Sequence, residues 1–226
     1  MSGAVFAGDW RADLRRSREA FREIVWPEIA VYVGGGSLVS LEEREDDDLD
    51  RTGGIDAYER LETGIRTIAQ RTQFIDDYQK PQTFTIRCAR RHHTLTEFHK
   101  RYDAINQGFD LPGLVIQAYV HEQRRQLMRV GITHGRPFYE YVFQQVDRWS
   151  TRHNSDGSAA FLVIPWVAIS KDNAAGRSNV PLLAKDVLGV VHRTPDTFFS
   201  RPLRAVFDLD ARFVTSGRRQ PGLLQI

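Results

Sequence analysis

Residues 54–73 read GIDAYERLETGIRTIAQRTQ and decide the fold. Two runs typical of β-strands, 54–58 and 65–73, flank turn-forming residues at 62–64. Residues 83–89, TFTIRCA, form a third run of the same kind. Because the three runs follow one another closely, we predict that they pair as antiparallel neighbours in one sheet.

The preceding segment, residues 9–26, has the pattern of an amphipathic helix. Asp9 can cap its start, and Pro27 follows as a stop signal. The apolar residues at roughly helical spacing are Leu14, Phe21, Ile24 and Val25. Three consecutive glycines, 34–36, then predict a turn before a short strand at 37–41.

A second helix is predicted after the third strand, over residues 94–106, with Thr94 or Thr96 as its cap. Its apolar stripe consists of Leu95, Phe98, Tyr102 and Ile105. Lys100 and Arg101 lie off this stripe, so we expect a basic outer side. Each helix must cover its apolar stripe, and we therefore expect both helices to flank the sheet.

The sequence patterns in the rest of the chain are less regular. The expected elements are a strand pair at 114–120 and 126–133, a helix at 137–149, an Asp156-Gly157 turn, a strand at 160–169, a loop at 170–180 and a strand from Leu203 or Ala205 to Val214. Pro165 predicts that the 160–169 strand is kinked or lies at an edge. We expect one α/β domain over residues 1–226, with a central mixed sheet flanked by helices.

Composition limits the class of protein. The 226 residues are 41% hydrophobic and 27% charged, which is typical of a folded chain. Cys88 is the only cysteine, so an internal disulfide and a cysteine-based zinc site are both excluded. No apolar run reaches about 18 residues and no secretion signal is evident, so we expect a cytoplasmic protein without a membrane partner.

Arginine dominates the positive charge. Four of the 31 basic residues are lysines, which leaves 27 arginines, although the formal net charge is only +2. Guanidinium groups suit bidentate contacts with phosphate. A GC-rich genome also enriches arginine without a functional reason. Seven acidic residues lie within 42–50, so the remainder of the chain is more basic than the total suggests.

The order of elements resembles the core of the PD-(D/E)XK nucleases, in which a helix precedes a three-stranded meander that is followed by a helix and a strand. The resemblance covers about residues 9–135, and residues 136–226 would form a C-terminal extension. It implies a restriction-endonuclease-like core. In this family an aspartate near the start of one strand and an acidic-x-lysine pair on the next converge on a divalent metal.

The resemblance assigns site residues by position. Gly54-Ile55-Asp56 matches the aspartate element, so Asp56 would hold Mg²⁺. Arg71 and Gln73 take the place of the acidic-x-lysine pair; Gln73 would orient the water or the phosphate, and Arg71 would stabilise the transition state. Arg71 cannot bind a metal, so a second carboxylate would have to come from Glu43, or alternatively from Glu19 or Glu23.

Basic residues near the third strand and the second helix are candidates for nucleic-acid contacts. They are Arg87, Arg90, Arg91, Lys100 and Arg101. The same charges could instead form a solvated helix face. His92, His93 and His99 match no known spacing of metal ligands.

Three functions remain open on the sequence. The first is a Mg²⁺-dependent nuclease, with DNA expected as substrate ahead of RNA. The second is a catalytically inactive module with a nuclease fold that binds nucleic acid or another protein, or its own copy. The third is a phage or mobile-element accessory protein that acts through protein contacts alone.

Overall fold

The computed structural model describes residues 10–39, 55–62, 64–76, 82–90, 95–187 and 189–194. The helical segments are α1 (Trp10–Ala20), the π-helix η1 (Phe21–Val25), α2 (Trp26–Val33), α4 (Glu97–Gln107), α5 (Gly135–Gln144), the 3₁₀-helix η2 (Val146–Arg148) and α6 (Trp166–Ala174). The strands are β1 (Ser37–Val39), β2 (Ala57–Leu61), β3 (Gly64–Ile75), β4 (Thr83–Arg90), β5 (Leu114–His121), β6 (Gln126–His134), β7 (Ser150–His153), β8 (Ala159–Pro165), β9 (Leu182–Asp186) and β10 (Gly189–Arg193).

Two sheets organise the described residues. A seven-stranded central sheet has the order β1-β2-β3-β5-β6-β9-β10, and a three-stranded second sheet has the order β4-β8-β7. Adjacent strands are antiparallel, apart from β3 and β5, which are parallel. A parallel pair needs a long crossover, and the chain between these two strands includes β4 and α4. The predicted α/β class, with a mixed sheet flanked by helices, is confirmed.

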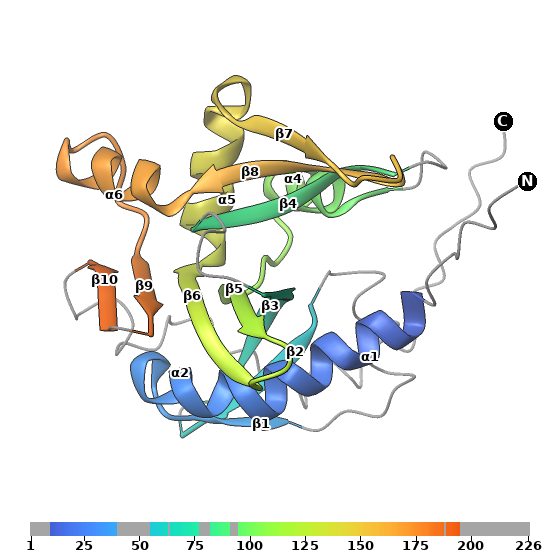
Figure 1. Cartoon of the computed structure of the whole chain (residues 1–226). Coiled ribbons are helices and arrows are strands. Elements are labelled where there is room, and N and C mark those ends of the chain that lie inside the picture. The colour runs from blue at the N-terminus through green and yellow to red at the C-terminus, as the bar shows by residue number, and fades with distance from the viewer. Residues whose placement is uncertain are drawn as a thin grey trace, which may run out of the picture.

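The central sheet carries a hydrophobic core on each face. On one face, buried residues of η1 and α2 such as Phe21 and Ile29 pack on Ile68, Ile116 and Val130. On the other face, residues of β3, β5 and β6 share a core with the second sheet, α5 and α6. Figure 1 shows α1 and α2 below the central strands, with the second sheet and α5 above them.

The helix predicted over residues 9–26 does not end before Pro27 but continues to Val33. At the junction the helix widens into the π-turn η1, where the Trp26 amide donates to the Phe21 carbonyl five residues back. Pro27 lies in the first turn of α2, where a residue without an N–H group is tolerated. The proline therefore changes the helical hydrogen-bond register and does not end the helix.

β4 does not join β3, so the prediction of one sheet formed by the three runs is wrong. β2 and β3 pair as expected, but β4 pairs with β8. The free edge of β3 is taken by β5, which is buried along its whole length and needs a neighbour on both sides. Accordingly, α1 contacts β3 and α4 contacts β4, so the two helices flank different sheets.

The outer face of helix α4 differs from the predicted one. Thr96 caps it, as expected, and forms a capping box with His99. Arg101, placed on a basic outer side by the sequence, is only 2% exposed, while Leu95 and Tyr102 of the expected apolar stripe are exposed. Burial of the guanidinium is possible because aromatic and acidic groups surround it, as described below.

The β5–β6 pair and the turn at Asp156-Gly157 are confirmed. The expected strand at 160–169 ends at Pro165 and is the middle strand of its sheet, so its prediction as a kinked or edge strand is wrong. Pro165 is the last residue of β8 and directly precedes α6. In this position it does not interrupt the strand pairing of β8 or the helical hydrogen bonds of α6. α6 also replaces part of the predicted 170–180 loop.

The helix expected at 137–149 is divided into α5 and η2. The strand predicted from Leu203 or Ala205 lies outside the described residues, as do Glu43, Arg91, His92 and His93. Among the helices that the structure describes, none has the length and apolar character needed to cross a membrane.

Candidate functional site

Asp56 lies immediately before β2 and binds the end of the β2–β3 ladder. Its backbone amide donates to the Ile68 carbonyl at 2.8 Å, and its carboxylate Oδ2 accepts the Gln70 amide at 2.7 Å. The carboxylate is partly buried and is engaged by the backbone of the neighbouring strand. These hydrogen bonds hold Asp56 against β3. One of its two carboxylate oxygens is therefore already used to bind the backbone of β3.

Arg71 lies on the face of β3 that looks toward the second sheet. Its Nη2 donates to Glu97 Oε2 at 3.0 Å, and its Nη1 lies 3.4 Å from Thr85 Oγ1 on β4. Gln73, two residues along β3, shares this face and pairs in register with Tyr119 of β5. The strand thus presents Arg71 and Gln73 on one face, as the two-residue spacing predicts, and Asp56 contacts the backbone just before them, at Gln70.

Glu97, the first residue of α4, was not selected from the sequence. One oxygen accepts Arg71 and lies 3.4 Å from the Arg87 backbone amide; the other accepts the Tyr139 hydroxyl at 3.2 Å. The carboxylate therefore links β3, β4, α4 and α5. Its position directly after the Thr96 cap, where the helix dipole favours an acid, was the available signal.

Arg101 lies behind Glu97 in the interior. Its guanidinium is 5.3 Å from the centre of the Tyr139 ring. Burial acts to lower the pKa of Arg101, but Tyr139, Glu97 and Asp56 outweigh it and raise the pKa above its ordinary value. Burial raises the pKa of Tyr139, which keeps its proton to donate. Arg101 is thus a permanent interior charge and is not placed to contact a phosphate at the surface.

Three arginines gather around Phe161 of β8. Arg87 on β4 and Arg152 on β7 are its cross-strand partners, so all three side chains leave the same face of the second sheet. The guanidinium of Arg71 reaches the same ring from β3, at 4.9 Å from its centre, and that of Arg87 lies at 5.6 Å. We call Arg71, Arg87, Arg152 and Phe161 the arginine surface.

The described part of the arginine surface contains one ion pair. Glu97 forms an ion pair with Arg71, and both side chains are 23% exposed. Phe161 and Arg87 are half-buried, and Arg152 is exposed. Burial raises the pKa of Tyr119, against which the hydrogen bonds with Thr83 and the charges of Arg71 and Arg152 act. Among the described residues, three arginines gather near the carboxylate of Glu97, and such a gathering of guanidinium groups suits an anion.

The other predicted nucleic-acid residues are spread more widely. Arg90 is exposed at the end of β4, beyond an irregularity in the β4–β8 register. Lys100 is half-buried on α4, and its backbone amide donates to the Thr96 carbonyl. Arg90 can extend the arginine surface along β4, whereas Lys100 belongs to the helix layer.

The expected magnesium site lies only partly within the described residues, because Glu43 is outside them. Within the ranges that the structure covers, no group of three or more histidine, cysteine, aspartate or glutamate side chains is placed to hold a metal ion. Arg71 brings a guanidinium to the position where the resemblance expects an acidic residue, and it pairs with Glu97. Glu19 is exposed on α1, and Glu23 pairs with Arg125.

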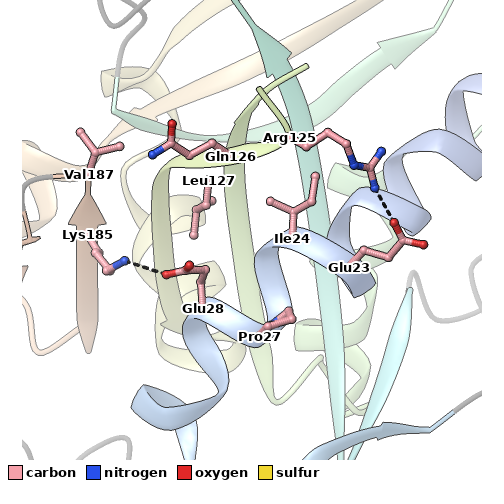
Figure 2. A pocket seen from close by; sticks show the side chains of 9 residues that line it. All are labelled: Glu23, Ile24, Pro27, Glu28, Arg125, Gln126, Leu127, Lys185 and Val187. Atoms are coloured by element: carbon pink, nitrogen blue, oxygen red, sulfur yellow. Dashed lines mark hydrogen bonds and ion pairs between the residues drawn. The ribbon is translucent and has the colours of Figure 1, made fainter. Parts of the chain in front are cut away.

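A groove of about 310 Å³ lies elsewhere, between η1, α2 and the ends of β6 and β9. Figure 2 shows its two ion pairs, Arg125 with Glu23 and Lys185 with Glu28, at opposite ends. Ile24, Pro27 and Leu127 provide apolar lining. The charges of this groove are already paired, so it offers less to an anion than the arginine surface does.

Comparisons of the chain with protein-family models, with curated proteins and with solved structures gave no match.

Proposed function

We propose that this protein binds nucleic acid through the arginine surface. The observation that carries the proposal is that Arg71 and Arg87 lie over the ring of Phe161, while Arg152 is the cross-strand partner of Phe161 on β7. One carboxylate, Glu97, lies among them. Within the described part of the chain, the surface therefore joins three guanidinium groups to a partly exposed aromatic side chain.

Each component has a role in binding a polynucleotide. Guanidinium groups form forked hydrogen bonds with phosphate oxygens and supply affinity that does not depend on base sequence. An aromatic ring provides a face on which a base can stack. Since the arginines come from ordered strands, less conformational entropy is lost on binding than if they lay on a mobile tail.

The order of elements supports a nuclease-like module. The described chain has a helical segment before β1, an antiparallel β1-β2-β3 meander, the crossover helix α4 and then β5 beside β3. The meander consists of β1, β2 and β3 and not of the three runs at 54–58, 65–73 and 83–89 that were predicted to pair, because β4 lies in the crossover and joins the second sheet. The Arg71–Glu97 ion pair favours a module that binds without cleaving, because a fixed positive charge stands where the family has a metal-binding acid.

A Mg²⁺-dependent nuclease is the second candidate, favoured by the position of Asp56 directly before β2. It is tested by incubating the protein with single- and double-stranded DNA and RNA in the presence of Mg²⁺ or Mn²⁺. Cleavage that is abolished by Asp56→Asn and retained by Arg136→Ala would establish it. If the protein binds these nucleic acids but cleaves none of them, the nuclease candidate fails and the proposal of a binding module stands.

The binding proposal is tested by fluorescence anisotropy with labelled DNA and RNA oligonucleotides at low salt. Arg87→Ala with Arg152→Ala should weaken binding at least tenfold, since two charged contacts are removed. Arg136→Ala is the matched control: it removes an exposed arginine that pairs with Glu140 on α5. Absence of binding at low salt, or equal effects of the double variant and the control, would refute the proposal.

A further inference from the structure

We infer that the ligand of the arginine surface is a single strand and not a duplex; this inference rests on the proposed function. It concerns the depth of the surface and the identity of its aromatic residue.

The inner part of the arginine surface lies between the two sheets. Thr85 of β4 donates to Gln117 of β5 at 2.9 Å, and Thr83 of β4 lies 3.0 Å from the Tyr119 hydroxyl. These contacts hold β4 against the central sheet next to Arg71. The Arg71 side chain is consequently 23% exposed, whereas Arg152 on the edge strand β7 is exposed.

Because Arg71 lies deeper than Arg152, the shape of a nucleic acid decides whether it can reach both residues. A duplex is stiff over about 150 base pairs and carries its phosphates on a convex outer surface. It can reach Arg152 and Arg90, but a convex rod cannot place a phosphate beside Arg71 while the sheets remain joined at Thr83 and Thr85. A single strand is narrow and flexible enough to pass along the inner surface.

Phe161 adds a second criterion. In a duplex the base faces are stacked on one another, so an aromatic side chain can reach them only by disrupting the stack. In a single strand the faces are open, and stacking on an aromatic ring contributes strongly to affinity for any base. The guanidinium groups of Arg71 and Arg87, which lie over the ring, would add cation–π contacts and would reach the phosphates that flank a stacked base.

The inference is tested by comparing one labelled 20-nucleotide DNA strand with the same strand annealed to its complement, by anisotropy at matched low salt. The single strand should bind at least tenfold more tightly. Phe161→Leu keeps an apolar side chain and removes the π-face, so it should weaken single-strand binding about tenfold and leave duplex binding unchanged. Val163→Ala, at the next position on the same face of β8, is the control for altered packing.

The possible results distinguish a failure of the single-strand assignment from a failure of nucleic-acid binding. Equal binding of both forms, tighter duplex binding, or single-strand affinity unaffected by Phe161→Leu would overturn the single-strand assignment while nucleic-acid binding stands. If neither form binds, the proposed function itself fails. Thermal melting of each variant, compared with the native protein, identifies any that does not fold; in that case Phe161→Tyr, which retains the π-face, should bind the single strand as the native protein does.

Discussion

At the scale of single residues, Glu97 links the parts of the candidate site. Its carboxylate contacts side chains or backbone from β3, β4 and α5. It also partly neutralises the cations that the proposal assigns to phosphate. Stability and ligand binding therefore place opposite demands on this residue.

Glu97→Gln should lower stability and raise affinity for nucleic acid. Loss of the charged hydrogen bonds should cost about 1–3 kcal/mol of unfolding free energy. Removal of the negative charge beside Arg71 should strengthen binding about fivefold, the equivalent of about 1 kcal/mol for one nearby charge. Urea unfolding and anisotropy measure the two effects. Weaker binding by a folded Glu97→Gln protein would show that Arg71 does not contact the ligand.

Asp172 is a residue whose role is structural. It is fully buried and accepts hydrogen bonds from the Tyr141 hydroxyl at 2.7 Å and from Arg177, as well as from Arg148. The Arg148 hydrogen bond is the main cause that lowers the pKa of Asp172 below its ordinary 3.8, with Arg177 and Tyr141 adding to it. These contacts join α5, η2 and α6.

The pKa of Asp172 predicts how stability depends on pH. Because the native state holds this carboxylate ionised to lower pH than the unfolded chain does, its stabilisation is complete above about pH 4. It is lost as the pH falls below 3.8. Asp172→Asn should reduce the unfolding free energy at pH 7 by about 2 kcal/mol or more and flatten the decline in acid. Thermal melts of both proteins from pH 2.5 to 7 measure it; parallel pH profiles would contradict the assignment.

The predictability of the site from sequence also differs residue by residue. Two-residue spacing on a strand sufficed to place Arg71 and Gln73 on one face, because side-chain direction is a local property. Arg152 and Phe161 could not be selected, since their positions beside Arg87 depend on the pairing of β8 with β4 and with β7. For Glu97 the helix cap was a signal, but its contact with Arg71 was not predictable. The interior position of Arg101 was also hidden, because it requires Tyr139 from a later helix.

At the scale of elements, local patterns predicted strands and helices better than their partners. The β5–β6 hairpin was predicted because its strands are adjacent in sequence and have complementary apolar patterns. β4 was assigned to the wrong sheet because its true neighbour, β8, begins about 70 residues later, and no local signal indicates such a pairing. Pro27 was assigned as a helix end because a π-turn depends on packing that the sequence pattern does not reveal.

The contact between β6 and α6 tests the packing of these elements. Gly131 lies on β6 with no side chain, and an added Cβ would lie 2.4 Å from the indole ring of Trp166. That indole is fully buried, so it has little room to move. Gly131→Ala should therefore destabilise the protein by about 1–3 kcal/mol through overpacking.

Trp166→Phe, which shortens the side chain, should restore part of the stability lost in Gly131→Ala when the two changes are combined. A double-mutant cycle by urea unfolding measures this coupling. Strictly additive effects would show that Gly131 and Trp166 are not in contact. Either result is independent of nucleic-acid binding.

At the scale of the whole molecule, the central sheet has different partners on its two faces. Helices α1 and α2 with η1 cover one face, while the second sheet with its helices covers the other and brings the arginine surface beside β3. The mixed α/β class followed from the alternation of predicted elements. The second sheet could not be predicted, because all four residues of β7 are exposed and its sequence does not alternate between apolar and polar residues.

The salt dependence of single-strand binding tests the central claim most directly. Each arginine that contacts a phosphate adds about 0.7 to the slope of log affinity against log salt concentration for a single strand. The account predicts a steep negative slope for the native protein, lowered in magnitude by about 1.4 when Arg87→Ala and Arg152→Ala are combined, and unchanged by Arg136→Ala. An equal slope for the native protein and the double variant would contradict a role for the arginine surface in binding.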